Sequence, residues 1–202
     1  MMMRIALTQL IISIFILTGC TGKEAKPTQY YVIDPGKYSD APLTQKTDIK
    51  LEVIDLQLPQ YLERFHIATR EEVNRLRFSD THQWAENFRK NLIRTLSRNL
   101  SSLLNTNDIA TPLGRSASVA DYRVQVYVEQ FEQQIDNSIN LVARWQVSSQ
   151  VQSKPLGIYS ADLKGGNELT EGDYDAMVTE MSQQFSELSR LIAKSILEHA
   201  DK

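Results

Sequence analysis

The chain contains a single cysteine, Cys20, and this one count limits how the fold can be held together. A disulfide needs two thiols, so no disulfide can form within the chain, even in an oxidising compartment. Hydrophobic residues make up 42% of the 202 residues and charged residues 23%, proportions that are ordinary for a globular protein. The fold must therefore depend on a packed hydrophobic core.

Cys20 stands directly after a short apolar run that is typical of a secretory signal. Arg4 supplies a positive charge, and the apolar run from Ile5 to Leu17 is too short to span a bilayer comfortably. Small residues follow at Thr18 and Gly19. The sequence LTGC at positions 17–20 resembles a bacterial lipobox, which implies cleavage before Cys20 and lipidation of that residue with three acyl chains. The alternative is an ordinary secretory signal followed by an unrelated cysteine.

This interpretation divides the chain into three parts. Residues 1–19 are the expected lipoprotein signal peptide, 20–29 a lipidated flexible tether and 30–202 a periplasmic domain. One acyl chain gives only marginal attachment to a membrane, whereas three make it effectively permanent. Thr21, where an Asp would imply retention at the inner membrane, implies sorting to the outer membrane. The polar tether could hold the domain up to roughly 30 Å from the lipid surface.

Charge and motifs exclude several classes of function. Removal of residues 1–19 leaves 183 residues, with 21 of the 22 Lys and Arg against 25 Asp and Glu. This mildly acidic balance argues against a nucleic-acid partner. The three histidines, His66, His82 and His199, lack metal-ligand spacing, so no metal is expected. Because no Gly-x-Ser-x-Gly or phosphate-binding loop occurs, we expect no cofactor and no enzymatic activity. A hydrolase with an unrecognised site is the alternative.

Hydrophobic periodicity predicts a sheet. Alternation in 122–129 and 139–147, joined through the turn residues Asp136-Asn137-Ser138, predicts a hairpin, and 156–163 predicts a third antiparallel strand. Strands are also expected at 30–34, 49–58, 65–70 and 73–78, with Glu71-Glu72 in a turn and a short strand within 109–113. The apolar positions change parity between Val53 and Ile54, which predicts a bulge.

Two helices complete the predicted fold. Trp84, Phe88, Leu92 and later residues recur at steps of four, so we predict a helix with Asp80 as N-cap and Gln83 completing a capping box, ending at 105–107. A second helix runs from Asp173 to the C-terminus, capped by Thr170 or Asp173. The predicted class is α+β: a single domain with a mainly antiparallel sheet and both amphipathic helices packed on one face.

Three short motifs connect this order of elements to a known family. They are Leu-Pro-Gln-Tyr-Leu at 58–62, Ile-Ala-Thr-Arg at 67–70 and Trp-Ala-Glu at 84–86. With these motifs in this order after a lipobox, the sequence resembles the ABC-type transport auxiliary lipoproteins of the PqiC/YmbA kind. The resemblance covers nearly the whole mature chain. Gln83 and Asn87 depart from the Arg and Pro usual in that family.

The resemblance implies a function at the cell envelope. It implies an outer-membrane-anchored, non-enzymatic accessory of an MCE-type (PqiAB-like) intermembrane phospholipid transport system, contributing to envelope integrity. The expected partners are an MCE-domain protein and, through the lipid anchor, the outer membrane. Self-association into a homo-oligomer is left open. A cell-wall-binding or envelope-assembly lipoprotein unrelated to transport is the alternative.

The candidate partner-binding residues are Pro59, Tyr61, Leu62 and Arg70. Tyr61 and Leu62 fit no strand or helix period and follow a rigid proline, so both are expected to be partly exposed. Arg70 is expected to pair with Glu71, Glu72 or Glu86, or with a partner's carboxylate. Trp84 is expected in the core because it starts the four-step apolar line of its helix, with an interface role as the alternative.

Overall fold

The computed structural model describes residues 26–36, 42–46, 48–114, 119–150, 152, 154–166 and 169–200. The predicted signal peptide, the lipidation site Cys20 and the sorting residue Thr21 lie outside the described residues.

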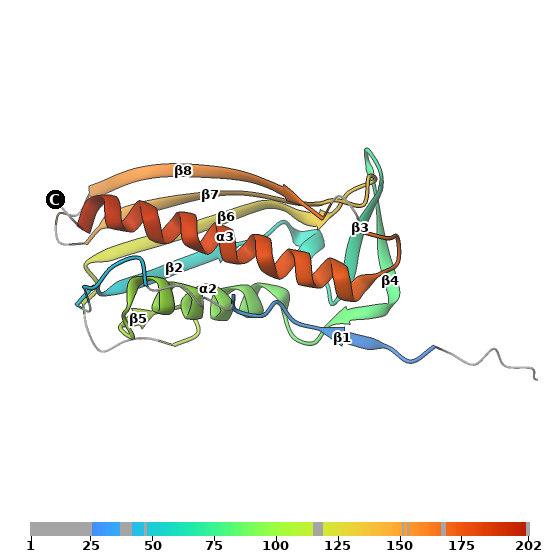
Figure 1. Ribbon diagram of the computed structural model, residues 1–202, viewed down its shortest axis with the longest axis horizontal. Coiled ribbons are helices and arrows are strands. Elements are labelled where there is room, and N and C mark those ends of the chain that lie inside the picture. The colour runs from blue at the N-terminus through green and yellow to red at the C-terminus, as the bar shows by residue number, and fades with distance from the viewer. Residues whose placement is uncertain are drawn as a thin grey trace, which may run out of the picture.

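Three long antiparallel strands form one side of the sheet, with β8 at its edge (Figure 1): β6 (Tyr122–Gln133), β7 (Ile139–Ser149) and β8 (Lys154–Gly165). The inward-facing positions of β7 are all buried, namely Ile139, Leu141, Ala143, Trp145 and Val147. In the β6–β7 turn Asn137 has a positive φ of 62°, which asparagine tolerates well. The predicted hairpin and third strand are confirmed.

The other edge of β6 is long enough to hold two strands in succession. β2 (Leu51–Gln57) runs parallel to the first half of β6, with a register shift between Val53 and Asp55 at the predicted bulge. After the 3-10 helix η2 (Gln60–Glu63), β3 (His66–Glu72) meets the end of β6. β4 (Arg75–Trp84), β1 (Gln29–Tyr31) and β5 (Ile109–Ala110) complete the eight-stranded mixed sheet.

The prediction for the start of the first helix is wrong. β4 continues to Trp84, and α2 (Phe88–Leu104) begins after Asn87, whose side chain accepts a hydrogen bond from the Lys90 amide at 3.1 Å. Asp80 and Gln83 belong to β4. Trp84 is buried as expected, but as the last residue of a strand, with its ring stacked on Phe88 at 4.2 Å. Glu71 and Glu72 likewise belong to β3 rather than to a turn.

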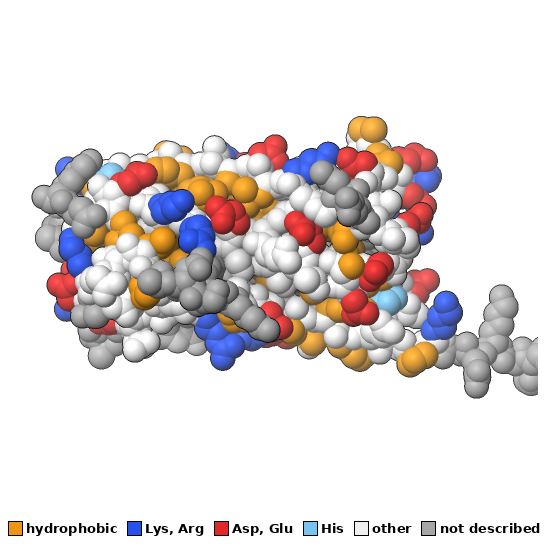
Figure 2. Space-filling model, viewed as in Figure 1, with side chains coloured by type: hydrophobic (Ala, Val, Ile, Leu, Met, Phe, Trp, Pro, Cys, Tyr) orange, Lys and Arg blue, Asp and Glu red, His pale blue; other side chains and the backbone are white. Residues whose placement is uncertain are grey.

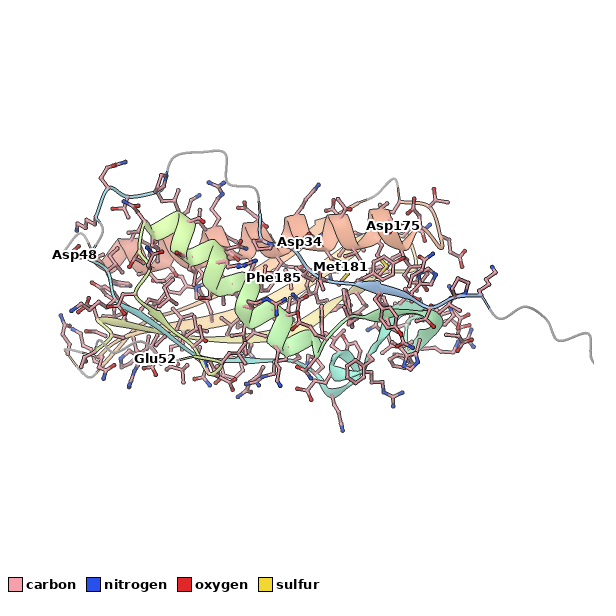
Figure 3. All side chains as sticks on the ribbon, turned by 90° about the horizontal axis from the view of Figure 1, so that it is seen from below. Asp34, Asp48, Glu52, Asp175, Met181 and Phe185 are labelled. Carbon is pink, nitrogen blue, oxygen red and sulfur yellow. The ribbon has the colours of Figure 1, made fainter. Side chains whose placement is uncertain are left out.

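Both helices cover the same face of the sheet (Figures 1 and 3). α3 (Tyr174–Ala200) is capped by Asp173, whose carboxylate accepts from the Ala176 amide at 3.0 Å. Met181 and Phe185 of α3 are buried in the one hydrophobic core that the helices share with the sheet. Because the longest strand pairings are antiparallel, the predicted α+β single domain is confirmed.

An extended segment, residues 33–36, lies against both helices and is held by side chains rather than by a strand. Asn91 of α2 accepts from the Ile33 amide at 2.7 Å and donates to the Ile33 carbonyl at 3.1 Å. One turn further along α2, Thr95 donates to the same carbonyl at 2.9 Å. Asn99 accepts from the Gly36 amide at 3.1 Å, and Ser182 of α3 accepts from the Asp34 amide at 3.3 Å. We call residues 33–36 the strap.

Candidate partner-binding site

The candidate site is built around Glu132, a buried carboxylate near the end of β6. Its side chain is 0% exposed. A register shift between Val128 and Gln130 changes the alternation of β6. As a result Phe131 packs in the core against Phe88 and Phe185, while Glu132 points to the opposite, helix-free face of the sheet. The bulge therefore decides which face carries the charge.

The carboxylate of Glu132 is fully engaged by donors from the surrounding elements. Its Oε1 accepts from Arg70 Nε at 3.1 Å, from Arg70 Nη2 at 2.7 Å and from Gln130 Nε2 at 2.8 Å. Its Oε2 accepts from the Tyr61 hydroxyl at 2.7 Å and from the Phe131 amide at 3.0 Å. A buried charge is tolerated when it is paired and hydrogen-bonded in this way.

The same network fixes the state of Tyr61. Burial, followed by the hydrogen bond to Glu132, raises the pKa of the Tyr61 phenol far above its usual value of 10.0. The phenol therefore stays protonated and acts as a donor. Arg70 is held at its far end as well, because Nη1 donates to the Val73 carbonyl at 2.9 Å. The two side chains have little freedom to move.

Tyr61 and Arg70 form part of the wall of an open groove of about 610 Å³. Its lining mixes polar and apolar side chains from η2, β3, β6, β7 and two turns: Tyr61, Arg70, Val73, Glu129, Gln130, Gln134, Ile135 and Val142. The Arg70 side chain is 22% exposed, so part of the guanidinium reaches the groove. A rigid groove of this kind suits the docking of a protein segment better than chemistry on a small molecule.

The predicted interface residues separate into two groups. Tyr61 and Arg70 meet on Glu132, and Pro59 is half-buried at the N-terminal end of η2. The expectation that Leu62 is partly exposed is wrong, because Leu62 is 4% exposed and packs in the core. The 3-10 geometry of η2 turns neighbouring side chains in opposite directions, which no simple period anticipates.

The expected ion pairs of Arg70 are also wrong. Its partner is Glu132 rather than Glu71, Glu72 or Glu86, and Glu86 pairs with Arg94 instead. Glu132 itself was missed by sequence reasoning. Simple alternation along β6 would have placed it on the core side with Val126 and Val128, and only the bulge moves it to the other face.

Among the residues that the structure describes, no group of His, Cys, Asp and Glu side chains is arranged to hold a metal ion. Within the same residues, no helix has both the length and the apolar character needed to cross a membrane.

Sequence comparison defines the class of protein to which this fold and groove belong. The family described as the ABC-type transport auxiliary lipoprotein component matches residues 31–193, which is most of the chain. The chain therefore belongs to this family, as the motifs at 58–62, 67–70 and 84–86 predicted. No curated protein matches the chain in sequence.

Solved structures share the fold. A crystal structure of an uncharacterized protein is 21% identical, with a TM-score of 0.64 over 85% of this chain and 99% of that one. Protein XCC0632 from Xanthomonas campestris, described as DUF330, is 11% identical, with a TM-score of 0.68 over 87% of this chain and 100% of that one. At these identities the likeness concerns the fold alone.

Proposed function

We propose that the protein is an outer-membrane-anchored periplasmic lipoprotein that serves as a non-enzymatic accessory of an MCE-type intermembrane phospholipid transport system. Its role is to hold an MCE-domain protein at the outer membrane and so to support envelope integrity. Membership of the transport auxiliary family supports the transport role, and the lipobox at 17–20 supports the anchor.

The observation that carries the binding role is the groove beside Glu132. Pro59, Tyr61 and Arg70 are the proposed contact residues, with Leu62 supporting the corner from within the core. Since the buried carboxylate holds Tyr61 and Arg70 in place before any partner arrives, binding would cost little side-chain entropy. Arginine and tyrosine in such rigid surroundings are common anchors of protein interfaces.

Val142→Arg tests the groove without replacing a member of the Glu132 network. Val142 lines the groove from β7, and an arginine there should obstruct a docked segment. We expect at least about tenfold weaker binding to the periplasmic part of an MCE-domain protein from the same genome, in line with loss of an interface anchor.

Gln146→Arg is the matched control. Gln146 lies on the same strand and the same face but outside this groove. Both variants should keep the melting temperature of the parent. If the two variants bind the partner equally well, the groove is not the docking site.

The lipid anchor is tested separately. Cys20→Ser should abolish incorporation of labelled fatty acid and release the domain from the membrane fraction, because no acyl chain can then be attached. Thr21→Asp should move the protein to the inner membrane in a host that sorts by this position. A Cys20→Ser protein that is still labelled would refute the proposed anchor.

A further inference from the structure

Exposed apolar side chains gather at the end of the molecule from which the described chain starts. Val73, at the tip of the β3–β4 hairpin, is 76% exposed, and Ile135, in the β6–β7 turn, is 57% exposed. Both lie on the rim of the same groove. Tyr30 and Phe65, beside the base of the hairpin, are also exposed. Figure 2 shows hydrophobic side chains at the upper right tip, where Figure 1 shows the β3–β4 hairpin.

The turns themselves do not require these two apolar residues. Tight turns favour Gly, Asn, Asp, Ser and Pro, and asparagines at 74 and 137 already occupy the turns. Val73 and Ile135 bring no turn chemistry and keep large apolar surfaces in water. Transfer of such surfaces to an apolar phase is favourable. The two tips are therefore suited to contact with an apolar environment outside the protein.

The charges next to the tips limit the kind of surface that they can meet. Arg75 lies 3.0 Å from Glu71 and 2.8 Å from Glu72, so two carboxylates flank one guanidinium on the hairpin. Beside the other turn, Lys164 pairs with Asp136 at 2.8 Å. With Arg75 and Lys164 paired in this way, the surface around the two tips has no excess of positive charge that would attract an anionic surface. Apolar insertion between uncharged or zwitterionic headgroups suits it better.

The position of the tether selects a lipid surface as the occupant. Lys26, the first described residue, lies at this end (Figure 1), and five residues separate it from Cys20. Such a segment spans at most about 20 Å. We propose that Val73 and Ile135 insert into the headgroup region of the bilayer that holds the lipid anchor. The orientation of the domain on the membrane rests on the proposed anchor at Cys20. The contact of Val73 and Ile135 with lipid does not depend on that anchor.

A tethered contact of this kind can be weak and still be occupied. The anchor converts docking into an intramolecular event at high effective concentration, so two aliphatic side chains are sufficient. The domain would then stand with this end on the membrane, with the groove opening beside the lipid surface. A partner in the groove would be held next to the bilayer.

The test replaces the acyl anchor with a chemical one, so that docking is measured independently of lipidation. The chain 20–202 with Cys20→Ser is attached through an N-terminal hexahistidine tag to nickel-chelating lipid in phosphatidylcholine vesicles. Among the described residues, the members of the hydrophobic core run from Tyr31 to Ile196, and all of them are kept in this chain. One cysteine, from Val73→Cys, Ile135→Cys or the control Leu113→Cys, carries an environment-sensitive fluorophore. Leu113 is exposed and lies just after β5, at the opposite end.

The readout is quenching of each fluorophore by aqueous iodide, with and without vesicles. We expect the quenching constant at positions 73 and 135 to fall by about half or more on tethering, as for side chains buried in the headgroup region, with no change at 113. The protection should persist at high salt. Equal quenching at all three positions would overturn the proposal. So would protection that requires an added MCE-domain protein, which would assign the tips to a protein interface.

Discussion

At the scale of single residues, Glu132 determines the shape of the candidate site. It lies in a position without contact with water, and five hydrogen bonds compensate for its charge. Removal of one partner of such a pair leaves the other charge buried and unpaired, whereas removal of both can be nearly neutral. The effects of substituting Arg70 and Glu132 on the free energy of unfolding should therefore be strongly coupled.

We expect Arg70→Ala to lower the free energy of unfolding by about 3 kcal/mol or more, because Glu132 then remains buried without its cation. Arg70→Met combined with Glu132→Gln should recover much of that loss. Urea unfolding of the single and double variants measures the coupling. Additive losses in the double variant would show that the two side chains do not act as a pair.

Tyr61 gives this network a pH dependence at the alkaline end. Its pKa in the folded protein is raised above the ordinary value of 10.0 by burial and by Glu132. The stability that this phenol contributes is present below pH 10.0 and is lost as pH rises towards the raised value, because the unfolded chain ionises first. The advantage of the parent over Tyr61→Phe in urea unfolding should shrink above pH 10.0. An advantage that stays constant there would contradict the network.

Residue-level prediction from the sequence found two of the four side chains in this network, Tyr61 and Arg70, and missed Gln130 and Glu132. Tyr61 and Arg70 stood out because they fitted no period or ended a strand. Glu132 did not, since its position depends on a bulge and its partners Tyr61 and Arg70 lie far away in the sequence. Local patterns carry no information on such long-range pairing.

At the scale of elements, α2 has two functions in the fold. Its apolar positions fill the core, while Asn91, Thr95 and Asn99 form a polar stripe that holds the strap. The strap leads back to β1 and so to the proposed anchor, which makes this stripe part of the connection between the domain and the membrane.

Asn91→Leu should lower the free energy of unfolding by about 2 kcal/mol or more, because the amide and carbonyl of Ile33 both lose a buried partner. Arg98→Leu, on the exposed side of α2, is the control and should change stability little. Thermal and urea unfolding of both variants provide the measurement. A similar small effect in the two variants would mean that the strap contributes nothing to stability.

The elements also show where sequence patterns succeed and fail. Alternation predicted β6, β7, β8 and the bulge in β2, because one face of β2, β6 and β7 is buried and one face of β8 is half-buried against the core. The start of α2 was misplaced because Trp84 happens to lie four residues before Phe88, in phase with the helix. β4 is half-exposed along most of its length, so it shows no alternation that could have corrected this.

At the scale of the whole molecule, one end carries the start of the described chain, the apolar tips and the groove. Its opposite end carries β5 and the end of α3 (Figure 1). This polarity agrees with an anchored domain that presents one surface to a partner close to the membrane. The family assignment gives the general class of function, and the groove is the location that we propose for partner binding.

The most direct measurement is site-specific photocrosslinking in cells that produce the lipidated protein. A photoreactive amino acid at position 134 or 142 lines the groove, and one at position 98 lies on the helix side of the domain. The account predicts crosslinks to an MCE-domain protein from 134 and 142, in the outer-membrane fraction, and none from 98. Crosslinks from position 98 alone, or none to an MCE-domain protein from the groove, would contradict it.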